Sequence, residues 1–168
     1  TVSEFLQNII RSDTSYYAIA DAFRVLTTID SVSAKKHVDD LLNTESHNDV
    51  IRKAALFYFG HVKNRNNYNH LKELAEYGVF SWKSRPTVIS ELGKYQKYSP
   101  KTFDFILPFI HDNDRFVRMA VIRHIGAHGS VHHFGLLDSA VGLDPVLSIN
   151  ALRAKDKISS RIKKKADS

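Results

Sequence analysis

An internal repeat with a constant spacing is the feature that most constrains what this chain can fold into. Three segments that begin at Ile51, Ser84 and Val117 align without a gap, with Arg at positions 52, 85 and 118 and Gly at positions 60, 93 and 126. The steps from position 52 to 85 and from 85 to 118 are both 33 residues. A fixed period of 33 residues is typical of repeat proteins, in which each unit buries its apolar surface against its neighbours. We therefore expect one domain of five repeats, at about 1–31, 32–64, 65–97, 98–129 and 130–165.

Each repeat is predicted to contain two helices. In the second helix of one repeat, apolar residues follow the 3.6-residue periodicity of a single buried stripe: Ile51, Ala54, Ala55 and Phe59. The first helices show two apolar columns with the spacing of the repeat, namely Phe5, Val38 and Leu71, and Ile9, Leu42 and Ala75. The pattern predicts an all-α fold, an α-solenoid (superhelix) of about five two-helix repeats.

Two residue types mark the ends of the second helices. Gly60, Gly93 and Gly126 follow the apolar stripes, and we expect them to close the helices in the left-handed conformation that glycine adopts readily. Pro86 is compatible with a helix only in the first turn, which predicts that this helix begins near Ser84.

Charge and composition exclude several classes of protein. The chain has no cysteine, so disulfides, a thiol nucleophile and Cys-ligated zinc are excluded, and no apolar run is long enough to span a bilayer. The net charge is +6, but residues 151–168 hold seven basic and two acidic side chains, so the rest of the chain is nearly neutral. A basic helix end is favoured by the helix dipole, and the neutral body disfavours nucleic-acid binding. Because no signal peptide is visible, we expect a cytoplasmic protein.

Two segments carry a resemblance to known families. Residues 106–126 resemble a HEAT-like repeat, with Pro108 in the first helix, an acidic turn, Val117-Arg118 and a final Ile-Gly. Residues 11–26, in which Ser15-Tyr16-Tyr17 precedes an alanine-rich segment, are similar to the opening of the HEAT-like C-terminal domain of zinc aminopeptidases of the membrane alanyl aminopeptidase family. The resemblance implies a fragment of a larger chain: a non-catalytic domain whose concave surface serves peptide access, domain docking or oligomerisation.

Catalytic residues of that family are missing from this sequence. Its zinc site is His-Glu-x-x-His, which does not occur here, so no catalytic residue or metal ligand carries over. No cofactor is expected in this chain, and the resemblance implies that zinc lies in a separate catalytic domain. Whether the chain belongs to an enzyme, a zinc metallo-aminopeptidase, is left open.

The partner is expected to be that catalytic domain or another protein or peptide. The alternative is a stand-alone HEAT-repeat scaffold for protein–protein interaction. DNA binding and bilin-lyase activity, also found among HEAT-like proteins, are disfavoured by the neutral body of the chain and the absence of cysteine.

Candidate binding residues lie outside the buried stripe of the second helices. Lys53 and Phe57 are expected to point outward, and the equivalent positions in other repeats include Ala20, Arg24 and Arg123. An apolar anchor flanked by cations would suit a peptide with carboxylates. Phe80 and Trp82, in the turn of the third repeat, form a second candidate anchor.

Two further polar sets are predicted to be structural. The column Arg52, Arg85 and Arg118 is expected to form a ladder to acidic or carbonyl groups of the adjacent repeat, with Asp49 and Asp114 one helical turn before two of its members. Four histidines, His124, His128, His132 and His133, are expected to be exposed turn residues rather than metal ligands, because no carboxylate lies among them and Gly126 is expected to end the helix.

Overall fold

The computed structural model describes residues 1–142 and 144–166, and the chain divides into two compact units, Thr1–Glu91 and Leu92–Ser168. Within the described residues there are eleven α-helices, three short 3-10 helices and no strand, which confirms the prediction of an all-α protein. None of the helices in this part of the chain combines the length and the apolar character that a membrane crossing requires.

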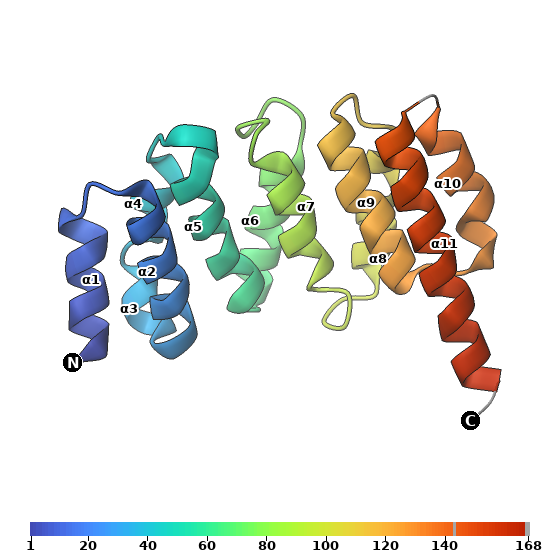
Figure 1. The fold of residues 1–168 in the computed structure, drawn as a ribbon. Coiled ribbons are helices and arrows are strands. Elements are labelled where there is room, and N and C mark those ends of the chain that lie inside the picture. The colour runs from blue at the N-terminus through green and yellow to red at the C-terminus, as the bar shows by residue number, and fades with distance from the viewer. Residues whose placement is uncertain (143, 167–168) are drawn as a thin grey trace. The chain divides into compact units, whose positions relative to one another are not determined.

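Unit 1 is built from seven α-helices and one short 3-10 helix (Figure 1). They are α1 (Val2–Ser12), α2 (Tyr16–Ile29), α3 (Ser31–Lys35), α4 (Val38–Asn43), η1 (His47–Asp49), α5 (Val50–His61), α6 (Arg65–Ala75) and α7 (Arg85–Gly93), whose last two residues belong to unit 2. Helix α2 packs against both α1 and α5. The core of the unit includes Phe23, Leu26, Ile51, Leu56 and Leu71, all fully buried.

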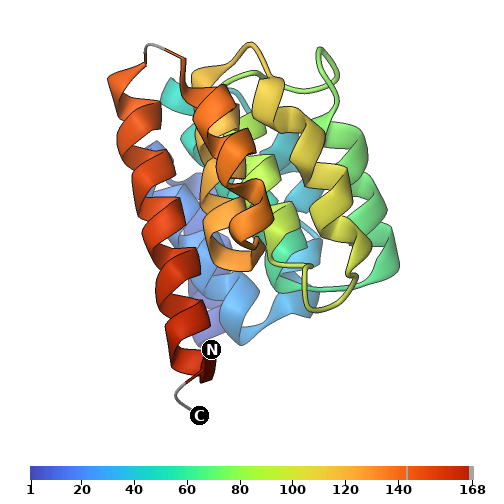
Figure 2. The same cartoon turned by 90° about the vertical axis from the view of Figure 1, so that its right-hand side faces the viewer.

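Unit 2 contains the remaining helices, and α9 lies beside α11 in both views (Figure 1 and Figure 2). Its elements are α8 (Lys101–Ile106), η2 (Leu107–His111), α9 (Arg115–His128), η3 (Val131–His133), α10 (Phe134–Val141) and α11 (Pro145–Ala166). Apolar residues from these helices form one core, with Ile106, Ile122, Ile125, Leu137 and Ile158 fully buried.

Local sequence signals explain where several helices begin. The Ser15 hydroxyl accepts a hydrogen bond from Ala18 N at the start of α2, and the Asp114 carboxylate accepts from Phe116 N at the start of α9. Such caps satisfy backbone N–H groups that have no partner inside the helix. Helix α7 begins at Arg85, with Pro86 in its first turn, so the prediction for this helix is confirmed.

The predicted apolar stripes are buried in most repeats but not in the first. Ile51, Ala54, Ala55 and Phe59 are buried, and so are the first-helix residues Val38, Leu42, Leu71 and Ala75. The prediction is wrong for Phe5, which is exposed, and Ile9 is only partly buried. Phe5 is 64% exposed, so no helix of unit 1 covers its side chain.

The repeated glycines do not close helices in the left-handed conformation, so this prediction is wrong. Gly60 and Gly126 lie inside α5 and α9, Gly93 is the last residue of α7, and none of them has a positive φ angle. Each instead lies against a residue of a later helix. A Cβ atom on Gly93 would lie 2.9 Å from Nδ1 of His124, and one on Gly126 would lie 2.9 Å from the Cα atom of Ala154. Glycine is present because a neighbouring helix leaves no room for a side chain.

Candidate functional site

The charge of the chain is concentrated in unit 2. Residues 1–91 hold eleven basic and eleven acidic side chains, whereas residues 92–168 hold thirteen basic and seven acidic ones. The sequence of α9 contains no carboxylate, and that of α11 contains only Asp156. Unit 2 therefore offers a basic helical pair, and any partner that this charge attracts is acidic.

A hollow of about 170 Å³ lies between α9 and α11 and is the candidate functional site. Its lining consists of Arg123, Gly126, Asn150, Arg153, Ala154 and Lys157. The two helices can approach closely here because Gly126 has no side chain where Ala154 packs. The residues from α11 stand at positions i, i+3, i+4 and i+7, which places them on one face of that helix.

Three cations surround this hollow without a carboxylate partner. Among the described residues, Arg123, Arg153 and Lys157 take part in no ion pair or hydrogen bond, and their side chains are exposed. Their charge is therefore available to a ligand, unlike that of the neighbouring cation Lys155, whose Nζ lies 2.5 Å from the Asp138 carboxylate.

Arg161, unlike the three cations of the hollow, is held by backbone carbonyl oxygens. It is on the same helix, but its guanidinium donates to the carbonyl oxygen of Gly126 at 3.1 Å and to those of Ala127 and Gly129. These carbonyls belong to the C-terminal end of α9, where backbone acceptors lack partners and a positive charge is favourable. Arg161 therefore stabilises the helix pair, and the positive charge that stays unpaired at the hollow is that of Arg123, Arg153 and Lys157.

The chemistry of the hollow favours an anion with oxygen acceptors. Two guanidinium groups can each donate two parallel hydrogen bonds to a carboxylate, and Lys157 adds a point charge. The Asn150 side chain donates from Nδ2 to Val146 O at 2.8 Å, which leaves its carbonyl oxygen and its second N–H for a ligand. A site of this kind binds and orients an anion.

Sequence reasoning singles out Arg123 but not Arg153, Lys157 or Asn150. It attributes the basic residues of 151–168 to the helix dipole as a group. The helical spacing of Asn150, Arg153 and Lys157 is the available signal, because it puts two cations on one face. That this face meets Arg123 depends on how α9 and α11 pack, which the spacing alone does not contain.

The other predicted binding residues lie in unit 1 and already have local partners. Arg24 forms an ion pair with Asp21 at 2.8 Å, Lys53 Nζ donates to Asn48 O at 2.8 Å, and the Phe57 ring stacks on His61 at a centroid distance of 5.5 Å. Ala20, which the same alignment places on the outer face, is buried.

The second predicted anchor divides into two unlike residues. Phe80 is partly buried, and its ring centroid lies 5.6 Å from Cζ of Arg52. Trp82 is exposed, with Lys83 Nζ at 5.7 Å from its ring. Phe80 thus packs on the arginine column, whereas Trp82 extends into solvent.

Two members of the arginine column bind the preceding helix of the same predicted repeat. Arg52 Nε donates to Leu42 O at 2.8 Å, and Arg85 Nε donates to Ala75 O at 3.0 Å. These carbonyl partners lie in the same predicted repeat as each arginine, whereas the sequence predicted partners in the adjacent repeat. Each arginine closes the C-terminal end of the helix before it. In Arg118 the buried Nε has no hydrogen-bond partner among the described residues.

Asp49 joins this column to the turn before α7. It is buried, pairs with Arg52 at 3.0 Å as the sequence predicts, and also accepts hydrogen bonds from the Ser81 and Ser84 hydroxyls. Burial alone would raise the pKa of Asp49, but the hydrogen bonds from the two serines and the charge of Arg52 outweigh it, so the pKa lies below its ordinary value. The carboxylate therefore remains ionised and links α5 to serines 32 and 35 positions further along the chain.

The histidine cluster differs from the prediction at His124, whereas His128 and His132 are exposed as expected. Helix α9 continues through Gly126 to His128, and the rings of His124 and His128 lie 4.8 Å apart. His124 is buried rather than exposed, and its Nε2 has no hydrogen-bond partner in the described part of the chain. Burial, together with the nearby His128, lowers the pKa of His124 to about 4. No group of three or more potential metal ligands occurs in the described residues.

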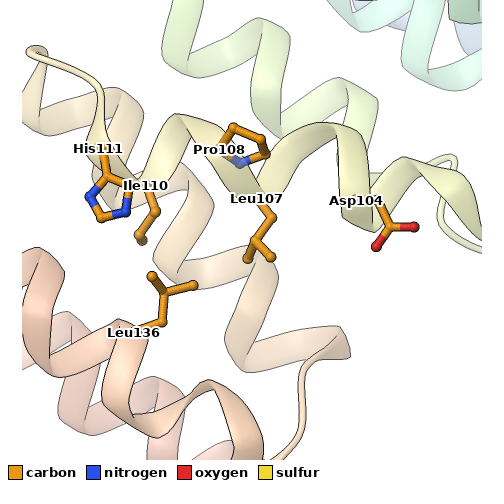
Figure 3. Close-up of a pocket in the computed structure, with 6 residues that line it drawn as sticks. All are labelled: Asp104, Leu107, Pro108, Ile110, His111 and Leu136. Carbon is orange, nitrogen blue, oxygen red and sulfur yellow. The ribbon is translucent and has the colours of Figure 1, made fainter.

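A second hollow of unit 2, of about 320 Å³, has a different character (Figure 3). Leu136 of α10 points toward Ile110 and Leu107, while Asp104 and His111 stand at opposite ends of the row. This hollow is mainly apolar, and its lining does not select a ligand class as the three cations of the α9–α11 hollow do.

Comparison with known proteins gives no assignment. No protein-family model matches the chain, and no curated protein matches it.

Proposed function

We propose that this chain is a non-catalytic HEAT-like helical domain that binds acidic peptide segments in the α9–α11 hollow. The observation that carries the proposal is the set of three exposed cations, Arg123, Arg153 and Lys157, around a concavity to which no carboxylate of the described residues is paired. A peptide with a terminal or side-chain carboxylate supplies the missing charge, and the donor geometry of the two guanidinium groups suits it.

The solenoid arrangement is part of this proposal. The alternation of first and second helices and the recurrent approach of a glycine to a later helix support it, because stacked helical pairs need small residues where their backbones come close.

The protein context that we propose is the C-terminal domain of a zinc aminopeptidase of the membrane alanyl aminopeptidase family. Its support is the resemblance of residues 11–26, in which Ser15 caps α2 immediately before Tyr16 and Tyr17. In that context the hollow would hold the acidic part of a peptide while a separate domain carries zinc and the chemistry. A His-Glu-x-x-His motif earlier in the same gene would support this, and a gene without any such motif would favour the stand-alone scaffold.

The binding proposal is tested by fluorescence anisotropy with a labelled ten-residue peptide ending in Glu-Glu and a free carboxylate. The comparison peptide ends in Gln-Gln-amide. We expect binding only of the acidic peptide, and binding should weaken as salt rises, since exposed charges carry the interaction. The double variant Arg153→Glu/Lys157→Glu should lose at least about ten-fold in affinity, because it reverses two of three charges.

The matched control is Lys163→Glu/Lys164→Glu, which makes the same charge change on the same helix outside the hollow. It should retain most of the affinity. Equal losses in both double variants would show that net charge alone attracts the peptide and would overturn the assignment to the hollow. A single-stranded oligonucleotide that binds more tightly than the peptide, and loses binding in the Arg153/Lys157 variant, would replace the peptide with nucleic acid.

A further inference from the structure

One face of unit 1 exposes apolar side chains in a regular arrangement. Val2 and Phe5 on α1, and Tyr17, Val25 and Ile29 on α2, are all exposed. The three residues of α2 lie on one stripe, since they differ by multiples of four positions, and Asp21, paired with Arg24, lies on the same stripe between Tyr17 and Val25. We call these five residues the α1–α2 outer face. Large apolar side chains grouped in this way usually mark a contact surface.

For Phe5 and Val25, most equivalent positions in later repeats are buried. For Tyr17 the equivalents include Lys83 and Phe116, which are exposed, so Phe5 and Val25 are the two positions that distinguish the first repeat. Phe5 is 64% exposed, whereas Val38 and Leu71, its equivalents in the next two repeats, are 3% and 0% exposed. Val25 is 47% exposed, whereas its equivalents in the later second helices are all buried, namely Tyr58, Glu91 and His124. At Phe5 and Val25 the first repeat thus keeps the apolar residues of an internal repeat without their cover, although Ile19 and Thr27 stand where later repeats have Arg and Gly.

Contacts within each unit show what provides that cover. Glu91 packs against Gly60 within unit 1, and His124 packs against Gly93 within unit 2. In both cases the side chain meets the glycine of the preceding second helix, at the same separation along the chain. At the end of the chain Ala154 meets Gly126 in the same way. Val25 is the member of this column that has no such helix in front of it.

We propose that the α1–α2 outer face docks a further helical pair of the same repeat kind, with a small residue opposite Val25. The inference depends on the stacking of helical pairs and not on the anion-binding hollow, so either proposal can fail alone. The required partner chemistry follows from the contacts: an apolar stripe to cover Phe5 and a glycine, alanine or serine where the second helices approach.

A second copy of this chain fits the face poorly. Ala154 lies 30 residues after His124 and takes the equivalent place in the last repeat. By the same step of 30 residues, the position equivalent to Gly126 is Asp156, which is exposed on α11. Head-to-tail stacking of two copies would place the Asp156 carboxylate against Val25, and burying an unpaired charge is costly. The favoured occupant is therefore a different helical pair.

The test fuses a second copy of residues 30–66 directly before Thr1 of the full chain. This copy contains Gly60, and the fusion sets that glycine as far ahead of Val25 as Gly60 lies ahead of Glu91 in the chain itself. We expect the midpoint of thermal unfolding to rise by about 5 °C, because a new repeat interface forms. The amides of α2 should also exchange with solvent more slowly than in the unfused chain.

Two variants of the fusion make the test specific. Gly60→Leu in the added copy alone should remove the gain, and so should Val25→Lys in the chain itself. Val25→Lys in the unfused chain should change the midpoint little, because this side chain is already half exposed. No gain from the fusion, or an undiminished gain in both variants, would overturn the proposal.

Sedimentation of the unfused chain tests the other occupant. We expect a monomer at about 100 µM, the concentration range in which weak self-association becomes visible. A dimer that Phe5→Glu dissociates would show that a second copy covers this face and would overturn the choice of partner.

Discussion

Gly126→Ala is predicted to destabilise the protein although alanine favours helices over glycine. In an open helix the substitution stabilises by about 1 kcal/mol. At this position the added Cβ atom would lie 2.9 Å from the Ala154 Cα atom and 3.0 Å from its Cβ atom. The first of these is a backbone atom of α11, so the clash can be relieved only by moving a helix.

The size of the effect is worked from two opposing terms. Overpacking of a tight interior contact costs about 1–3 kcal/mol. After the propensity gain is subtracted, we expect a net loss of about 1 kcal/mol, equivalent to a fall of about 3 °C in Tm for a chain of this size. Gly135→Ala is the matched control, because Gly135 is also helical and no atom lies within 4 Å of the position of its Cβ. That variant should raise Tm by about 1–2 °C.

Thermal unfolding followed by circular dichroism, at several heating rates and with reversibility checked, measures both variants. The two shifts should have opposite signs. If both glycine variants raise Tm by similar amounts, the close approach of α9 and α11 is not a constraint, and the explanation of the repeated glycines fails.

Two further predictions concern buried ionisable groups. The pKa of His124 is about 4 in the folded chain and about 6.5 when unfolded, so the unfolded chain binds one more proton as pH falls from 6.5 to 4. The free energy of unfolding should therefore fall by roughly 2 kcal/mol over this window. Urea titrations at several pH values measure this dependence, and His124→Gln should make it flatter. A slope unchanged in His124→Gln would contradict this. Asp49→Asn should lower the free energy of unfolding in urea by about 2 kcal/mol, because the charged hydrogen bonds with Arg52 and Ser84 are weakened. Asn tolerates the left-handed backbone at this position (φ 56°), so the backbone adds no further cost. Asp39→Asn, at an exposed site, is the control, and equal effects of the two variants would refute the role of the Asp49–Arg52 pair.

The helical character of this chain could be predicted because it depends on near neighbours in the sequence. The stripe of Ile51, Ala54 and Ala55 repeats every turn, and Pro86 allows a helix only from its first turn onward. These are interactions across three or four residues, which a single sequence displays directly.

Contacts between distant segments could not be predicted in the same way. The sequence placed Arg123 among the candidates but did not bring Arg153 and Lys157 to it, because their meeting depends on the packing of α9 on α11. The pairing of Asp49 with Arg52 follows from their spacing within one helical turn, whereas the bonds from Ser81 and Ser84 could not be read from any local pattern.

The sequence by itself determined the period of the repeat, the all-α character and the recurrence of Arg and Gly. The tertiary structure decided what those residues do. Gly126 looked like a helix end, but it is the point where α11 approaches α9. Arg161 and Arg153 are alike in sequence, yet one is held by α9 carbonyls and the other is open to a ligand. Side-chain roles differ in this way because they depend on atoms brought close in space from distant parts of the chain, and a local pattern contains no record of that approach.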